Sequence, residues 1–211
     1  MDALFHTLFS SFVLLFIVID PIGVAAIFAA LSHEGGPAYQ RRMALRGILL
    51  AGGILFTFVL VGNYLLAVLG IGVPAFRIAG GVLLFMIALD MMFARPSGLR
   101  YATVRERREA QQKEDISVFP LAFPLISGPG AMTTVLLMSG AGHDTVVFTG
   151  LLLVILCVLI LSYLALRTAP FIVRILGETG INVVNRLLGL ILAALAVQFV
   201  IDGVKVSLFN G

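Results

Sequence analysis

The chain has 211 residues, of which 60% are hydrophobic and only 12% are charged. An ordinary soluble domain carries about 25% charged residues, so this composition excludes that class. The mean hydropathy of +1.11 instead predicts a helical domain that crosses a membrane several times. The net charge of +3 comes mostly from residues between apolar segments, so we interpret it as a topology signal and predict no nucleic-acid partner.

Apolar segments follow one another along the whole chain. About 20 apolar residues suffice to cross a bilayer, which leaves little chain for a separate soluble domain. The start, Met1-Asp2-Ala3, lacks the basic region of a cleavable signal, so we expect the first segment to be retained. The single cysteine, Cys157, excludes an intramolecular disulfide. The segments lie at about 4–31, 43–69, 74–94, 117–140, 146–166 and 183–208.

The first apolar segment is interrupted at its centre by Asp20 and Pro21. Proline removes a backbone N–H and clashes with the preceding helical turn. In contrast, Asp followed by Pro is well suited to begin a helix, with Asp as the N-cap and Pro in the first turn. We therefore predict two half-helices that meet at Asp20.

A second interruption follows about 108 residues later, in Phe123-Pro124-Leu125-Ile126-Ser127-Gly128-Pro129-Gly130. A small residue again precedes a proline, and a helix-like run continues to Ser139. Free N–H groups at the start of a half-helix attract negative charge, and paired broken helices mark the binding site in many secondary transporters. The alternative is that both prolines only kink packed helices.

The two interruptions belong to an internal repeat. Arg77 follows Pro21 by 56 residues and Arg186 follows Pro129 by 57, and each arginine opens a third apolar segment. Because three crossings per half is an odd number, the halves must be inverted relative to each other. The predicted fold is all-α, with six transmembrane helices in two inverted three-helix repeats, the first helix of each being broken. The single membrane domain 1–211 divides into repeat one at 1–94, a cytoplasmic loop at 95–116 and repeat two at 117–211.

The distribution of lysine and arginine predicts the orientation. With the N-terminus outside, twelve of these residues face the cytoplasm and two face outward. Both termini are therefore expected on the outer side. The Arg-Glu-Arg-Arg-Glu core of the long loop predicts a short solvated helix. The inner set comprises Arg41, Arg42, Arg46, Arg95, Arg100, Arg105, Arg107, Arg108, Lys113, Arg167, Arg174 and Arg186, and the outer set Arg77 and Lys205.

Four motifs together resemble the MarC family, also called UPF0056 or the SnatA-like neutral amino-acid transporters. The resemblance covers essentially the whole chain and implies a bacterial inner-membrane protein with six spans. With the orientation predicted above, its termini are periplasmic. The resemblance also places the chain in a wider superfamily that includes LysE-type amino-acid exporters. The family name comes from an antibiotic-resistance locus, which does not establish drug efflux. The motifs are Asp20-Pro21-Ile22-Gly23, the stretch from Phe123 to Ala131, Arg77-Ile78-Ala79-Gly80-Gly81 and Arg186-Leu187-Leu188-Gly189.

A small neutral amino acid, such as glycine or alanine, suits the predicted site. Its carboxylate is expected on the N–H groups of Ile22 and Gly23 or on those that follow Pro129, and glycines there allow close approach to the backbone. Its ammonium is expected near Asp20, which is also the candidate for a coupling H⁺ or Na⁺. The competing interpretation is that Asp20 only caps its own half-helix. The predicted substrate-binding residues are Asp20, Pro21, Ile22, Gly23, Ser127, Gly128, Pro129, Gly130, Ala131 and Thr133.

Three alternatives to uptake are an exporter of LysE type, a non-transporting membrane protein and an intramembrane enzyme. Ser127 has no nearby base in the sequence, because the three histidines lie at segment ends. The sequence contains no HExxH, Cys/His cluster or Walker motif. We therefore predict no catalytic residue, cofactor or metal. Membrane lipids are the expected surroundings, and small-residue faces such as Ala25-x3-Ala29 permit a dimer or trimer.

Several polar residues within the apolar segments are interpreted as structural. Asp202 is expected to pair with Lys205, three residues further along the chain. Asn63 and Gln198 are expected to form hydrogen bonds between helices.

Overall fold

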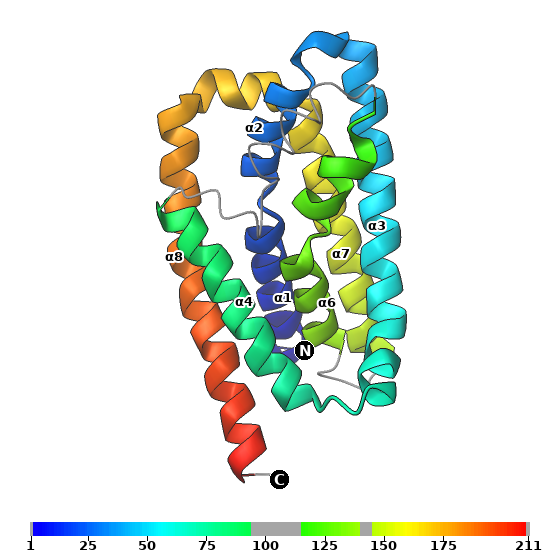
Figure 1. The fold of residues 1–211 in the computed structure, drawn as a ribbon, viewed down its shortest axis with the longest axis vertical. Helices are drawn as coiled ribbons and strands as arrows, with labels where there is room; N and C mark the ends of the chain where they lie inside the picture. Colours follow the sequence, from blue (N-terminus) through cyan, green and yellow to red (C-terminus); the bar gives the residue numbers. More distant parts are fainter. Residues whose placement is uncertain (1, 94–114, 140–144, 210–211) are drawn as a thin grey trace.

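The computed structural model describes residues 2–93, 115–139 and 145–209, and this part of the chain is helical (Figure 1). The predicted solvated helix of the long loop falls outside the described residues. In chain order the elements are α1 (Asp2–Ile19), α2 (Pro21–Leu31), η1 (His33–Gly35), α3 (Gly36–Val68), α4 (Val73–Phe93), η2 (Ser117–Ile126), α6 (Pro129–Ser139), α7 (Thr145–Arg167) and α8 (Ala169–Phe209).

The helices are long and apolar enough to cross a membrane. Five spans qualify on their own, and η2 with α6 gives a sixth if this bent pair is counted as one. Large apolar side chains point outward from the bundle, including Leu49, Leu153 and Leu187, each at least 60% exposed. A lipid-facing surface explains this pattern. The all-α membrane fold is therefore confirmed, whereas the division into inverted repeats stays a prediction.

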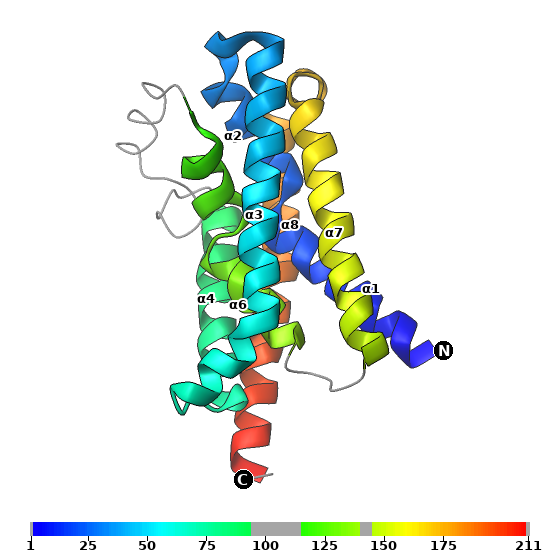
Figure 2. The same ribbon diagram turned by 90° about the vertical axis from the view of Figure 1, so that its right-hand side faces the viewer.

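The helices α3 and α7 each lie against the interrupted helix of the other half of the chain. α3 packs along η2 and α6, while α7 packs along α1 and α2 (Figures 1 and 2). Gly47 and Gly62 of α3 bring that helix directly against Leu121 and Leu136. The centre of the bundle is apolar and closely packed, and its fully buried residues include Leu15, Leu55, Leu84, Ile126, Ile155 and Leu192.

The helices α4 and α8 form the most extensive pair in the described structure. A Cβ atom on Gly81 would lie 2.8 Å from the carbonyl oxygen of Ala196, and one on Gly189 would lie 3.0 Å from that of Ala88. Such small residues let two helix backbones touch. Glycine is therefore required where these helices meet.

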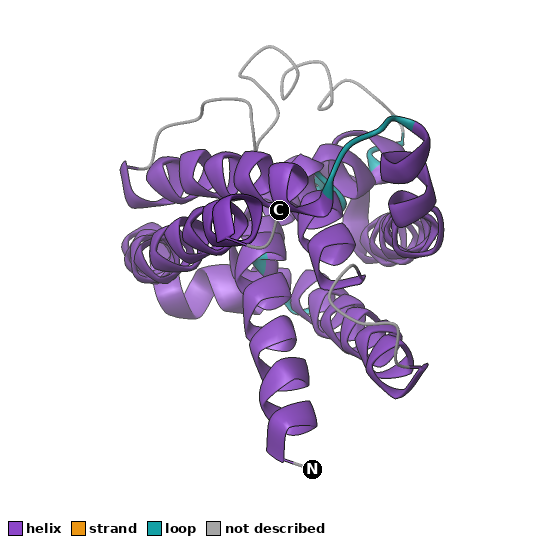
Figure 3. Cartoon of the chain, turned by 90° about the horizontal axis from the view of Figure 1, so that it is seen from below, coloured by secondary structure: helices purple, strands orange, loops and turns teal. Residues whose placement is uncertain are grey.

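The first helix enters the bundle obliquely. In Figures 2 and 3 the early turns of α1 project beyond the other helices, and Phe5 and Phe9 are exposed there. The later turns of α1 are buried, so its deepest residues lie next to the interruption at Asp20. The start of α1 and the end of α8 lie toward the same end of the bundle (Figure 1). This is the arrangement that an even number of crossings produces.

The predicted start of the last segment was wrong. The connection expected before segment 183–208 is helical, because α8 begins at Ala169 and is interrupted only at Gly177, with φ 63° and ψ 176°. Glycine adopts this conformation without a Cβ penalty. In Figure 1 this first part of α8 crosses the upper end of the bundle before the helix descends. Arg174 and Glu178 lower the local hydropathy, so the apolar pattern did not indicate the helix that begins at Ala169.

Of the three predictions for polar residues, those for Asp202 and Gln198 were also wrong. Asp202 accepts a hydrogen bond from Gln198 Nε2 at 2.8 Å, and no ion pair with Lys205 occurs among the described residues. This bond lies within α8, because the i,i+4 spacing places both side chains on one helix face. The interhelical bond of Asn63 is confirmed, since its Nδ2 donates to Ser139 Oγ at 3.3 Å.

Candidate functional site

The first interruption is formed by one residue, Asp20. Its φ of 50° and ψ of 71° are left-handed, a conformation that Asp tolerates better than most residues. The carboxylate oxygen Oδ1 accepts a hydrogen bond from the Gly23 N–H at 3.1 Å, and the side chain is completely buried. The predicted half-helices and the predicted N-cap are therefore confirmed. A carboxylate is fixed deep inside the bundle.

The cap changes what the start of α2 can bind. Pro21 has no N–H, and the N–H of Gly23 already donates to Asp20. A Cβ on Gly23 would collide with the Asp20 carboxylate, so this carboxylate occupies the space directly over the glycine. A ligand carboxylate is consequently disfavoured at the first interruption, and a cationic group is favoured.

The second interruption is longer than predicted. Phe119 and Phe123 both have extended backbone conformations, with φ near −130° and ψ of 125° and 128°. Each precedes a proline, which disfavours the helical conformation, and both Phe–Pro peptide bonds are cis. The irregular helix η2 then meets α6 at a bend of 53°. The predicted break near Gly128 is confirmed, and the departure from regular helix begins earlier, at Phe119.

The start of α6 has no side-chain cap from the preceding position. Gly128 occupies the place that Asp20 has before α2, and a Cβ there would collide with the carbonyl oxygen of Pro124. Ser127 is buried, and its hydroxyl donates to the Ala122 carbonyl at 2.7 Å instead of facing the helix start. The N–H groups after Pro129, those of Gly130 and Ala131, lack an intrahelical acceptor by the geometry of a helix start. An anion at this helix start would contact these N–H groups.

The two interruptions lie next to each other. The Cβ position of Gly130 is 3.5 Å from Val18 Cγ1, two residues before Asp20, and 2.6 Å from Ile87 Cδ1 of α4. Another predicted residue, Thr133, packs its methyl group against Gly80. Gly130 and Thr133 therefore lie where α6 meets α1 and α4, whereas Gly23 lies against Asn185 of α8.

Some buried polar atoms in the described structure have no hydrogen-bond partner, including Thr134 Oγ1 and Asn185 Oδ1. The amide nitrogen Nδ2 of Asn185 lies 3.3 Å from the Cβ position of Gly23, so this α8 side chain reaches the first interruption. Our sequence interpretation did not include Asn185. Its only local signal was a polar residue directly before Arg186, and its position over Gly23 depends on tertiary packing.

Comparison with known proteins agrees with the motifs. A family model described as MarC family integral membrane protein matches residues 5–208. The chain belongs to the MarC family. A UPF0056 membrane protein of Archaeoglobus fulgidus is 37% identical over 96% of this chain and 94% of its own length. The UPF0056 membrane protein YhcE of Escherichia coli is 32% identical over 98% of this chain and 95% of its own length. The UPF0056 membrane protein YvbG of Bacillus subtilis is 36% identical over 92% of this chain and 92% of its own length.

No solved structure matches the chain. The relatives are named as membrane proteins. Membership of the MarC family, together with the apolar helices, identifies a multi-pass integral membrane protein.

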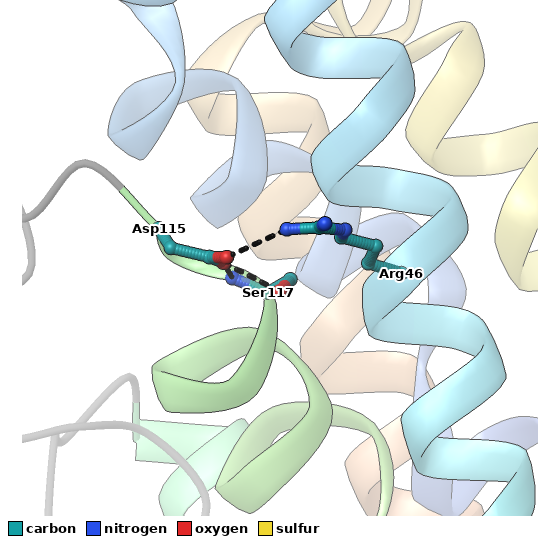
Figure 4. Close-up of polar contacts among 3 residues, drawn as sticks. All are labelled: Arg46, Asp115 and Ser117. Atoms are coloured by element: carbon teal, nitrogen blue, oxygen red, sulfur yellow. Dashed lines mark hydrogen bonds and ion pairs between the residues drawn. The ribbon is translucent and has the colours of Figure 1, made fainter.

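This MarC-family chain also has a polar contact at the start of its second interrupted helix. Asp115 accepts hydrogen bonds from the backbone N–H and the hydroxyl of Ser117, and it pairs with Arg46 Nη1 of α3 at 3.1 Å (Figure 4). The hydrogen bonds from Ser117, and secondarily the charge of Arg46, hold the pKa of Asp115 below its usual value. Since both charged side chains are nearly half exposed, the pair positions η2 more than it stabilises the fold.

The described residues around the two interruptions offer a limited set of polar groups. Within 2–93, 115–139 and 145–209, no group of three His, Cys, Asp or Glu residues is arranged to hold a metal. The available groups are one buried carboxylate, an amide, hydroxyls and backbone N–H groups.

Proposed function

We propose that this protein is a secondary transporter that moves small neutral amino acids across the bacterial inner membrane. One observation carries the proposal: the two interruptions pack together and have opposite electrostatic character. Asp20 supplies a buried negative group at one, and α6 begins after Gly128 without a side-chain cap at the other. A zwitterion carries the two complementary charges.

In the proposed complex the ligand carboxylate binds the N–H groups of Gly130 and Ala131, where the helix dipole also attracts an anion. The ammonium faces Asp20 and compensates its buried charge. Apolar side chains, those of Val18, Ile87 and Leu84, lie within 3.5 Å of the Cβ position of Gly130. Because these apolar side chains lie so close to Gly130, the proposed site favours a ligand with a small side chain, as in glycine or alanine.

Inverted repeats are the proposed basis of alternating access. The contact between α4 and α8 supports this, because it is reciprocal: a glycine of each helix meets the carbonyl oxygen of an alanine on the other. Such reciprocity is expected of a two-fold relation between equivalent surfaces. The same separation along the sequence relates Pro21 to Pro129, Gly81 to Gly189, and Ala88 to Ala196.

The proposed orientation has both termini in the periplasm. Exposed arginines at the start of α3 and the end of α7, such as Arg41 and Arg167, lie at the end of the bundle opposite the start of α1 (Figure 1). Positive charge favours the cytoplasmic side. Asp20 is the proposed group for a coupling H⁺ or Na⁺, because a membrane-embedded acid can hold either cation.

Uptake by purified protein in liposomes tests the proposal. Labelled glycine and alanine are offered with and without pH and sodium gradients, and we expect accumulation that depends on one gradient. Asp20→Asn keeps the size and an oxygen that can cap α2 but removes the charge, so we expect it to abolish or uncouple uptake. Asp202→Asn, near the end of α8, is the matched control and should retain transport. Undiminished coupled uptake by Asp20→Asn would remove Asp20 from the mechanism.

A further inference from the structure

Asn185 is a side chain of α8 that reaches the first interruption. Its Nδ2 lies 3.3 Å from the Cβ position of Gly23, and the Cγ atom of Asp20 lies 2.9 Å from the same point. The amide and the carboxylate therefore share the space directly over Gly23. The amide belongs to α8, and the carboxylate belongs to Asp20 at the junction of α1 with α2, far away in the sequence.

The orientation of the amide leaves a hydrogen-bond acceptor available. The Nδ2 group, a donor, is the Asn185 atom that lies nearest the Cβ position of Gly23, beside the Asp20 carboxylate. The carbonyl oxygen Oδ1 of the same amide lies farther from that point, is buried and has no hydrogen-bond partner among the described residues. A buried acceptor without a donor is unfavourable, so a bound group with N–H donors would satisfy it.

We propose that Asn185 Oδ1 accepts a hydrogen bond from the ammonium group of the bound amino acid. The inference rests on the proposed function and adds a selectivity to it. The Asp20 carboxylate attracts any cation, whereas Asn185 requires an N–H directed at its oxygen. Each N-methyl group removes one N–H and adds bulk, and an N,N-dimethylated ammonium keeps a single N–H that cannot serve both Asp20 and Asn185. The site therefore selects a primary ammonium over a dimethylated one. Asn185 is a specificity-determining residue, and the ligand class is a small amino acid with a free amino group.

Binding and uptake of three labelled compounds test this inference: glycine, N-methylglycine and N,N-dimethylglycine. For the unaltered protein we expect affinity to fall in that order. Asn185→Leu removes the acceptor at similar volume. Because a hydrogen bond to a charged group is lost, glycine affinity should fall about 10- to 100-fold. The preference for glycine over N,N-dimethylglycine should shrink in the same variant.

Two further variants separate a lost contact from a folding defect. Asn185→Ala removes the acceptor with a smaller side chain and should behave like Asn185→Leu, whereas Asn185→Asp keeps an oxygen in place and should retain the preference for glycine. Gln198→Leu is the control, because it removes an exposed amide from the same helix. Circular dichroism establishes that each variant is folded.

The outcomes distinguish the two proposals. Glycine binding with unchanged affinity and unchanged preference in Asn185→Leu or Asn185→Ala would overturn the role of Asn185 and leave the transporter proposal standing. If the unaltered protein neither binds nor transports any amino acid in the panel, the transporter proposal fails and this inference fails with it.

Discussion

Replacing Gly81 by alanine tests the contact that joins α4 and α8. The new Cβ would lie 2.8 Å from the carbonyl oxygen of Ala196 and 3.1 Å from the backbone nitrogen of Val200. Carbon–oxygen contacts at helix interfaces are normally about 3.3–3.6 Å. Because both obstructing atoms belong to the backbone, a rotamer change cannot relieve the overlap. The two helices must separate by about half an ångström.

The expected cost follows from that displacement. Overpacking a closely packed contact lowers the free energy of unfolding by about 1–3 kcal/mol. For a chain of this size each kcal/mol shifts the Tm by about 2–4 °C, so Gly81→Ala should lower it by about 2–12 °C. Gly189→Ala should have a similar effect, since its Cβ would lie 3.0 Å from the carbonyl oxygen of Ala88.

Far-UV circular dichroism during heating in detergent measures this Tm, because the chain is helical and contains no tryptophan for a fluorescence assay. Gly53→Ala is the control. A Cβ on Gly53, in α3, would meet no atom within 4 Å, and alanine is favoured over glycine in a helix by about 1 kcal/mol. Gly53→Ala should therefore raise the Tm. Equal Tm values for Gly81→Ala and Gly53→Ala would refute the close contact of α4 with α8.

Two further predictions concern the second interrupted helix. Gly128→Ala should lower both glycine uptake and Tm, because its Cβ would meet the Pro124 carbonyl oxygen. Unaltered uptake by this variant would contradict the account of the second break. Since the pKa of Asp115 is lowered in the folded state, its contribution to stability is present above about pH 3.9, the usual Asp value, and is lost as the pH falls through the folded pKa. Thermal melts between about pH 5 and 3 should therefore depend less on pH in Asp115→Asn, and identical pH dependence would contradict this role.

The sequence predicted those features of the site that depend on local chemistry. Asp20 and Pro21 are adjacent, and both the N-cap and the first helical turn arise within four residues, so the first break followed from the sequence. The extension of the second break to Phe119 was also visible, because Phe-Pro occurs at 119–120 and again at 123–124. A proline disfavours the helical conformation of the residue before it, and at both positions that residue is a phenylalanine.

Other features depend on packing between distant segments. Asn185 lies over Gly23 because α8 packs against α2, and no spacing within one segment indicates that contact. The bond that Asp20 makes to Gly23 also changed the expected roles of the two breaks. The sequence interpretation allowed a ligand carboxylate at either helix start, whereas the cap favours the start of α6.

The central claim is that one site binds both charges of a zwitterion, and competition binding tests it most directly. Labelled glycine is bound to the purified protein and challenged with alanine, with acetate, which has only the carboxylate, and with methylamine, which has only the ammonium. We expect alanine to displace glycine, and acetate and methylamine to do so only at far higher concentrations. Displacement by acetate or methylamine as effective as that by alanine, or no glycine binding at all, would contradict the account.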